Sequence, residues 1–125
     1  MKQFKTEILH KINTADDLKI SPLRADGKTY GTPTWIWEVV VEGELYVRAY
    51  NGTMGRWYQS AIQQKAGQIH AAGMVKDVVF EAANNKEELQ SKIDAAYREK
   101  YSNSPYLGSM IREEAKAATV KISPQ

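Results

Sequence analysis

The sequence TWIWEVVVEGELYVRAY, which spans residues 34–50, carries the clearest signal of a fold in this chain. Two runs rich in Trp, Val and Tyr flank the dipeptide Glu42-Gly43, and a two-residue connection that contains glycine is typical of a β-hairpin. We therefore predict strands over 34–41 and 44–50. With Glu42 and Gly43 as the loop, the predicted cross-strand pairs are Val41–Glu44, Val39–Tyr46, Trp37–Arg48 and Trp35–Tyr50.

The predicted hairpin has two unlike faces, because side chains alternate along a strand. One face is aromatic with a single cation, which suits a ligand or a partner subunit; it consists of Trp35, Trp37, Val39, Tyr46, Arg48 and Tyr50. The other face has the composition of a barrel core and consists of Ile36, Glu38, Val40, Leu45, Val47 and Ala49. Glu38 is the one charged residue on this otherwise apolar face. It is either an acid with a raised pKa or a residue that lies at an edge or pairs with a cation, and we favour the second interpretation.

Hydrophobic periodicity and turn residues divide the rest of the chain. The predicted helices lie at 4–12 and 55–65, after Asn85 (a capping box with Glu88) and from Ser104-Pro105. Of the remaining predicted strands, one ends near Pro22, and the other three span residues 68–72, 75–82 and 117–122. Short strands broken by single helices favour a mainly β (α+β) class, with one domain over residues 1–125 built as a small barrel with about three peripheral helices.

The composition argues against several classes of function. The 17 basic and 15 acidic residues are interspersed and give a net charge of +2, whereas nucleic-acid binders usually concentrate basic residues on one face. There is no cysteine, and His10 and His70 have no carboxylate at ligand spacing, so we expect no metal site. No apolar run approaches the ~20 residues that cross a bilayer, and the charged first residues lack the apolar core of a signal peptide. We therefore expect a cytoplasmic protein without nucleic-acid or membrane partners.

Residues 48–58, RAYNGTMGRWY, carry the main functional signal. A β-patterned run ends here in a glycine-bounded turn and restarts as a helix. Glycine lets the backbone approach a ligand closely, and a helix N-terminus presents unpaired N–H groups with a partial positive charge. Together with Arg48 and Arg56, this turn predicts a seat for a phosphate under a flat aromatic ring. No catalytic motif occurs elsewhere in the sequence.

Each residue of this predicted site also has a structural interpretation. Arg48 either binds phosphate or stacks on Trp37 across the hairpin as a cation–π pair. Arg56 is either an anion ligand, which we favour, or a solvated charge at the unfavourable end of a helix dipole. Gly52 and Gly55 are needed wherever the turn adopts a positive φ. The hairpin aromatics are more typical of a core or a subunit interface than of a cofactor wall.

Several motifs resemble a small bacterial family known only as a domain of unknown function. They are Leu45-Tyr46-Val47-Arg48-Ala49-Tyr50, Gly52, Gly55-Arg56-Trp57, Gly73, Val78-Val79-Phe80-Glu81, Ile93-Asp94-Ala95-Ala96-Tyr97-Arg98, Lys100-Tyr101 and the ending from Ala115 to Val120. The similarity covers nearly the whole chain. That family is allied to the flavin-binding split β-barrels of the pyridoxamine-phosphate-oxidase type and to the deazaflavin-dependent nitroreductases.

The resemblance implies a six-stranded split β-barrel of the FMN-binding type that works as a homodimer. In such relatives the isoalloxazine ring lies at the dimer interface, and a basic strand residue with the turn before the next helix holds the phosphate. Carried over by position, the cofactor-binding residues are Arg48, Tyr50, Asn51, Gly52, Gly55, Arg56 and Trp57, with Trp35 and Trp37 against the ring. The implied cofactor is FMN or a deazaflavin, and no catalytic side chain is implied.

Two functions from different classes follow. The first is a flavin-type oxidoreductase that passes hydride to a small molecule; because the cofactor does the chemistry, the protein needs no acid–base pair. The second is a non-enzymatic dimeric ligand-binding or structural module that has lost its cofactor, with the partner subunit filling the aromatic face. Binding of single-stranded nucleic acid on a basic, aromatic barrel face is a third option, and the modest net charge argues against it.

Overall fold

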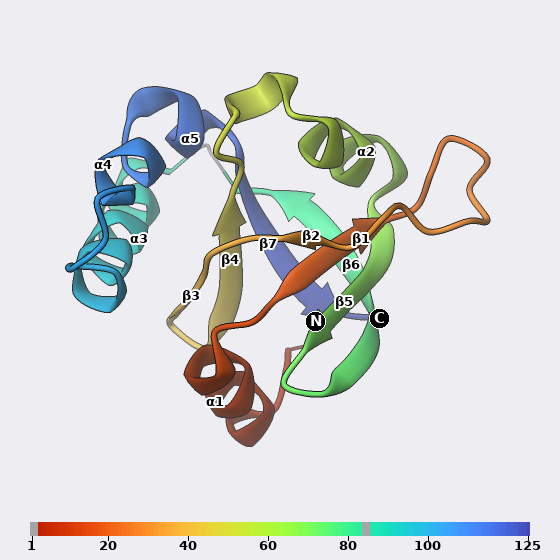
Figure 1. Ribbon diagram of the computed structural model, residues 1–125, viewed down its shortest axis with the longest axis horizontal. Helices are drawn as coiled ribbons and strands as arrows, with labels where there is room; N and C mark the ends of the chain where they lie inside the picture. Colours follow the sequence, from red (N-terminus) through yellow and green to blue (C-terminus); the bar gives the residue numbers. More distant parts are fainter. Residues whose placement is uncertain (1–2, 84–85) are drawn as a thin grey trace.

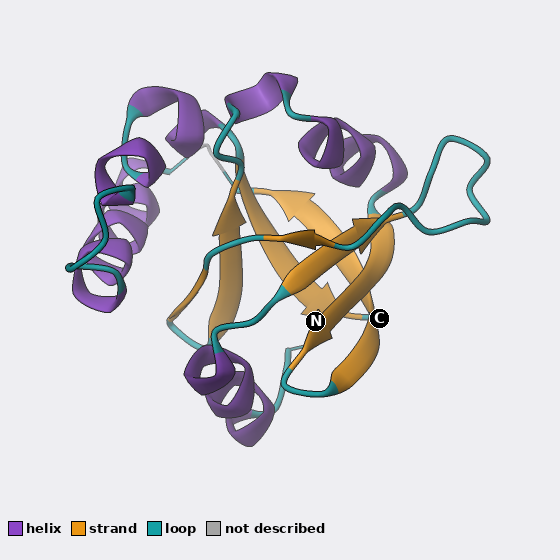
Figure 2. Cartoon of the chain, viewed as in Figure 1, coloured by secondary structure: helices purple, strands orange, loops and turns teal. Residues whose placement is uncertain are grey.

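Seven antiparallel strands form one curled sheet in the computed structural model, which describes residues 3–83 and 86–125 (Figure 1). Along the sheet their order is β2-β1-β5-β6-β7-β4-β3. The strands are β1 (Lys19–Pro22), β2 (Thr34–Trp35), β3 (Glu38–Val41), β4 (Glu44–Arg48), β5 (Ala66–Ala71), β6 (Met74–Ala82) and β7 (Thr119–Pro124). Helices surround this sheet on several sides (Figure 2).

The helices are more numerous than the sequence predicts. They are α1 (Thr6–Ala15), the short 3-10 helix η1 (Gly52–Met54), α2 (Arg56–Gln64), α3 (Glu87–Lys100), α4 (Leu107–Met110) and α5 (Glu113–Ala117). The helix expected from Ser104-Pro105 begins only at Leu107, after a turn in which the Ser104 hydroxyl accepts a hydrogen bond from the Tyr106 amide at 3.2 Å. The predicted cap at Asn85 lies outside the described residues. Within the described residues, no helix combines the length and apolar character needed to cross a membrane.

The hairpin at residues 38–48 is confirmed near its turn. Glu42 has φ +53° and Gly43 has φ +76°, the left-handed conformation at both loop positions that matches the twist of a two-residue hairpin. The pairs Val41–Glu44 and Val39–Tyr46 have the predicted register.

The outer part of the predicted hairpin is wrong. The expected strand over 34–41 is interrupted at Ile36 and Trp37, so the pairs Trp37–Arg48 and Trp35–Tyr50 do not form. Trp35 instead pairs with Lys19 of β1, and the Ile36 amide donates to the Leu18 carbonyl at 3.1 Å. One predicted strand becomes two, which accounts for seven strands where six were expected.

This interruption explains why the sheet curls. The strands β2 and β3 lie at opposite edges of the sheet, yet only two residues connect them. A chain advances by at most about 3.5 Å per residue, so the two edges must come close together. The sheet is therefore a half-barrel, and Ile36 is buried inside it.

Two apolar clusters hold the fold together. The first fills the half-barrel and includes Ile36, Leu45, Val47 and Ala49, as predicted for the core face of the hairpin. The second lies between the outer face of β3 and β4 and the helix α3; it contains Val39, Val41, Tyr46, Ala83, Ile93, Tyr97, Tyr101 and Met110. Much of the face expected to meet a ligand or a partner is thus covered by the chain's own helix.

Candidate functional site

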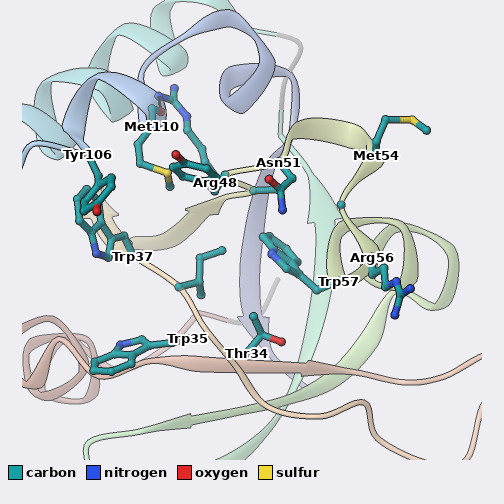
Figure 3. Close-up of a pocket in the computed structure, with 14 residues that line it drawn as sticks. Thr34, Trp35, Trp37, Arg48, Asn51, Met54, Arg56, Trp57, Tyr106 and Met110 are labelled. Atoms are coloured by element: carbon teal, nitrogen blue, oxygen red, sulfur yellow. Dashed lines mark hydrogen bonds between the residues drawn. The ribbon is translucent and has the colours of Figure 1, made fainter.

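A pocket of about 950 Å³ opens where the β2–β3 link, the turn after β4 and the helix α4 meet (Figure 3). It is lined by Thr34, Trp35, Ile36, Trp37, Arg48, Ala49, Tyr50, Asn51, Met54, Gly55, Arg56, Trp57, Tyr106 and Met110. All the predicted site residues except Gly52 are in this set. Trp37 and Tyr106 lie on one side of the pocket, and Trp57 and Arg56 on the other.

The turn after β4 is shaped by Gly52, which lies beneath the pocket surface. Gly52 is buried and has φ +71°, and a Cβ there would lie 3.3 Å from the carbonyl oxygen of Glu114. Both the conformation and the lack of space favour glycine. Gly55 has φ −63°, so the expected need for a positive φ holds for Gly52 alone.

The helix α2 begins at the pocket edge with Arg56. Its N-cap is Gly55, and no side chain caps it. The first amides of a helix lack acceptors within the helix and give this end a partial positive charge. The Arg56 side chain is exposed, and no ion pair to it is found in the described part of the chain. The end of α2 therefore offers a free guanidinium beside uncapped amides.

Arg48 lies in the floor of the pocket but is fully buried, and its donors are occupied by the protein. Its Nε donates to Thr119 Oγ1 at 3.1 Å, Nη1 donates to Asp94 Oδ1 and to the Met110 carbonyl at 3.1 Å, and Nη2 donates to Gln90 Oε1 at 2.6 Å and to the Gln90 carbonyl at 3.3 Å. A guanidinium has five N–H donors, so none is left over. Arg48 therefore has no N–H group left for the phosphate contact expected of it.

The alternative role predicted for Arg48 also needs correction. Its guanidinium carbon lies 5.5 Å from the centre of the Tyr97 ring, so the cation–π partner is a helix residue and not Trp37. Asp94, which binds Arg48, also lies 3.1 Å from Lys116 Nζ. The sequence analysis missed Asp94. A carboxylate next to Ile93 on the apolar stripe of a helix is the signal that could have identified it.

Five aromatic side chains line the pocket: Trp35, Trp37, Tyr50, Trp57 and Tyr106. Trp37 stacks on Tyr101 with ring centres 4.1 Å apart and an angle of 4° between the planes. Four large side chains at the pocket are exposed although apolar: Met54 (79%), Trp35 (66%), Tyr106 (60%) and Tyr50 (46%). Tyr106 and Met110 come from residues near α4 that the sequence analysis did not connect with the site. Nothing in the local sequence indicates that they approach the hairpin.

Glu38 lies behind the Trp37 wall and satisfies both interpretations given above. It is buried and binds Lys100 of α3, as expected for an acid paired with a cation. Burial also raises the pKa of its carboxyl group to about 7, against the opposing effect of Lys100. Glu38 does not line the pocket, so it is not placed to touch a ligand there.

The site lacks the groups of several common chemistries. No His, Asp or Glu lines the pocket, and no cluster of three metal-ligating side chains occurs among the described residues. Among the described residues, the pocket provides flat apolar surface and, at Arg56, a cation without an ion-pair partner. This combination suits the binding of an aromatic anion.

The half-barrel with its aromatic pocket defines a class of fold, and comparison with known proteins gives the family. The chain belongs to the family described as "Uncharacterized protein conserved in bacteria (DUF2255)", whose model matches residues 8–122. This confirms the resemblance to a bacterial domain of unknown function. A search of curated proteins gave no match.

Among solved structures, the chain is similar to the crystal structure of the conserved hypothetical protein Rv2991 from Mycobacterium tuberculosis. The TM-score is 0.61 with 15% sequence identity, and the alignment covers 98% of this chain and 83% of that one. At this identity the likeness is one of fold.

Proposed function

We propose that the pocket binds a planar aromatic cofactor with a phosphate tail, FMN or a deazaflavin, and that the protein is an oxidoreductase acting on a small molecule. The observation that carries this proposal is the position of Arg56. Its free guanidinium and the uncapped start of α2 lie at one side of a pocket that is also lined by five aromatic side chains.

The size and composition of the pocket support this class of ligand. Its volume of about 950 Å³ lies within the ~300–1,000 Å³ usual for cofactor pockets. Trp37 stacks on Tyr101 and presents a flat surface to the pocket. Trp57, on the opposite side of the pocket, supplies a second aromatic surface (Figure 3). Aromatic rings favour offset stacking on other rings.

The chain's residues would then divide into two roles. Arg56 and the first amides of α2 would neutralise the phosphate, since a charge-assisted hydrogen bond at a helix N-terminus favours an anion. Trp35, Trp37, Trp57 and Tyr50 would surround the ring and limit its contact with water. A bound flavin would supply hydride transfer itself, so the lining needs no His, Asp or Glu for that step.

Replacement of Arg56 by alanine tests the phosphate contact. We expect Arg56→Ala to weaken FMN binding about 10-fold or more, because a hydrogen bond to a charged group contributes ~1.5–3 kcal/mol. The melting temperature should stay unchanged, since the side chain is exposed. Fluorescence titration with FMN and with the deazaflavin gives the dissociation constants.

Arg98→Ala is the matched control, because Arg98 is also an exposed helix arginine but does not line the pocket. Equal affinities in the wild type and both variants would remove Arg56 from the site. Failure of the wild type to bind either cofactor, together with colourless purified protein, would overturn the proposed function.

A second function is favoured by the exposed side chains at the pocket. Trp35, Tyr50, Met54 and Tyr106 together form a large exposed apolar surface, and such surfaces mark interaction sites. In this alternative the protein is a non-enzymatic dimeric binding or structural module, and a second copy fills the pocket. A pure dimer that cannot be reconstituted with FMN or a deazaflavin would favour it.

A further inference from the structure

A cluster of ionisable side chains lies behind the Trp37 wall of the pocket. Glu38 is fully buried, and its Oε2 finds no hydrogen-bond partner in the described part of the chain. Lys100 contacts Glu38 Oε1, and its Nζ donates to the Glu38 main-chain carbonyl at 2.9 Å. The same Nζ lies 3.4 Å from Asp16 Oδ1 at the end of α1. One ammonium group is therefore shared between two carboxylates.

Tyr101 connects this cluster to the pocket. Its hydroxyl group donates to Asp16 Oδ1 at 2.6 Å and lies 3.3 Å from the Glu38 carbonyl. Its ring stacks on Trp37 with an angle of 4° between the planes. Trp37 directly precedes Glu38 in the chain and lines the pocket. A change in the partners of Lys100 or Asp16 can therefore alter the position of Trp37 through the Tyr101 side chain.

We propose that Glu38 and Lys100 form a pH-responsive switch that sets the position of Trp37 in the pocket wall. With Glu38 ionised, Lys100 is held between two carboxylates. Protonation of Glu38 removes one of these anionic partners, and Lys100 is then attracted mainly to Asp16. Asp16 also accepts the hydrogen bond of the Tyr101 hydroxyl. When Lys100 moves towards Asp16, the Tyr101 hydroxyl shifts, and the Tyr101 ring moves together with the Trp37 ring that is stacked on it.

The charges around Glu38 support a change of protonation within the physiological range. The groups that face it are Lys100, Tyr97 and Tyr101 from α3 and Asp16 and Asp17 from the end of α1. Burial and the two aspartates raise the pKa of Glu38, and only Lys100 opposes them, which leaves the pKa at about 7. Burial raises the pKa of both tyrosines above the ordinary value, so they remain neutral hydrogen-bond donors.

The consequence of this switch for cofactor affinity rests on the proposed function, whereas the movement of Trp37 does not require a ligand. The test is therefore made on the protein without added cofactor. Trp35→Phe/Trp57→Phe leaves Trp37 as the one tryptophan, because the chain has three. Its emission maximum and its quenching by acrylamide are followed from about pH 5.5 to about 8.5, which brackets the ordinary pKa of histidine and the raised pKa of Glu38.

We expect one transition of the Trp37 signal with a midpoint near the pKa of about 7, and its loss in Glu38→Gln. Lys100→Gln should also abolish the transition, because the Lys100 ammonium group is the contact that links Glu38 to Asp16, the acceptor of the Tyr101 hydroxyl. His10→Gln/His70→Gln should leave the transition in place, which excludes the two histidines as its source.

The same transition should appear in the chain with all three tryptophans, as a shift of the Trp37 indole N–H resonance in ¹⁵N–¹H spectra. This measurement serves if the Phe variants or Glu38→Gln fold poorly. A flat signal in the wild type, or a transition that survives Glu38→Gln with an unchanged midpoint, would refute the switch. If FMN fails to bind while the Trp37 transition is present, the proposed function falls and the switch stands.

Discussion

Arg48 and Glu38 are buried charges on neighbouring strands, and their hydrogen bonding differs. All five N–H donors of Arg48 meet acceptors from α3, α4 and β7. Glu38 keeps one oxygen without a partner among the described residues. A buried charge is tolerated when its hydrogen bonds are satisfied and is costly when they are not. We therefore expect Arg48 to hold the fold together and Glu38 to make its stability depend on pH.

Removal of the Arg48 side-chain charge should destabilise the protein strongly. Among the described residues, Arg48→Met leaves the buried Asp94 with Lys116 as its one ion-pair partner, and loss of one partner of a buried ion pair costs ~3–5 kcal/mol. Urea unfolding monitored by circular dichroism measures this loss. The double variant Arg48→Met/Asp94→Leu should recover part of it, because it also removes the buried carboxylate that has lost its Arg48 partner. A single variant within about 1 kcal/mol of the wild type would contradict this role.

Glu38→Gln should change how stability depends on pH. The pKa of Glu38 in the folded protein is raised from the ordinary 4.5 to about 7. Between these values the folded protein retains a proton that the unfolded chain has released. This group therefore lowers the free energy of unfolding as pH rises through the window, by up to about 1.4 kcal/mol per pH unit, and has a constant effect above the folded pKa.

The free energy of unfolding of the wild type minus that of Glu38→Gln should accordingly fall between about pH 4.5 and 7. Denaturant unfolding at several pH values measures this difference. Glu99→Gln is the control, since Glu99 is an exposed acid of the same helix as Lys100. A difference that is flat, or that rises with pH, would show that Glu38 does not titrate as proposed.

At the scale of elements, the segment 34–41 contributes a strand to each of the two edges of the sheet. Its alternation predicts one strand, but β2 pairs with β1 and β3 pairs with β4. The link between them carries Ile36 into the core and Trp37 to the pocket wall. The pocket therefore lies where the curled sheet nearly meets itself, and its walls depend on how closely the strands pack.

Of the glycines, Gly67 has the least space for a Cβ, and it lies where β5 pairs with β1. A Cβ at this position would lie 2.5 Å from the Ser21 carbonyl oxygen, 2.7 Å from Pro22 Cα and 2.8 Å from the Phe80 ring. Two of these contacts are backbone, which cannot rotate away. Gly67→Ala should therefore cost at least the ~1–3 kcal/mol of an overpacked core.

Gly108 provides the matched control for this substitution. A Cβ at Gly108 would meet nothing within 4 Å, and the residue lies in α4. Gly108→Ala should be neutral or stabilise the protein by up to about 1 kcal/mol, because alanine favours helix more than glycine does. Thermal unfolding of both variants compares them. Equal melting temperatures would mean that β1 separates from β5 at little cost.

At the scale of the whole molecule, the pocket surface remains partly uncovered. Exposed apolar side chains from β2, the turn after β4 and the residues before α4 surround it. A single chain leaves this surface in water, where burial of apolar area against a partner is favourable. We therefore expect two copies of the chain to associate around the pocket.

We expect the protein to be a homodimer with twice the chain mass of 14.1 kDa. Trp35→Ser/Tyr106→Ser should shift it towards the monomer, because these side chains are 66% and 60% exposed at the pocket. Val75→Ser is the control, since Val75 is 58% exposed but does not line the aromatic pocket. Multi-angle light scattering gives the mass. A wild-type monomer at all concentrations would refute the dimer, and equal effects of the two changes would place the interface elsewhere.

Features of this fold that depend on near neighbours in the chain could be predicted from the amino-acid sequence. Side-chain alternation and local backbone preference predict four such features. They are the turn at Glu42-Gly43, the register beside it, the inward face of the hairpin and the glycine turn before α2. Because these features lie close together in the chain, most of the residues that line the pocket could be named from the sequence.

The partners of the buried charges could not be predicted in this way, because they come from distant segments of the chain. Arg48 resembles a phosphate ligand in its strand, but its carboxylate partner lies 46 residues away on α3. Three other features likewise result from contacts between distant segments. The strand expected over 34–41 is split in two, α3 covers the aromatic face, and Tyr106 lies at the pocket. The physical reason is that local preferences fix the conformation of a segment, whereas the partner of a buried side chain is fixed by how the segments pack.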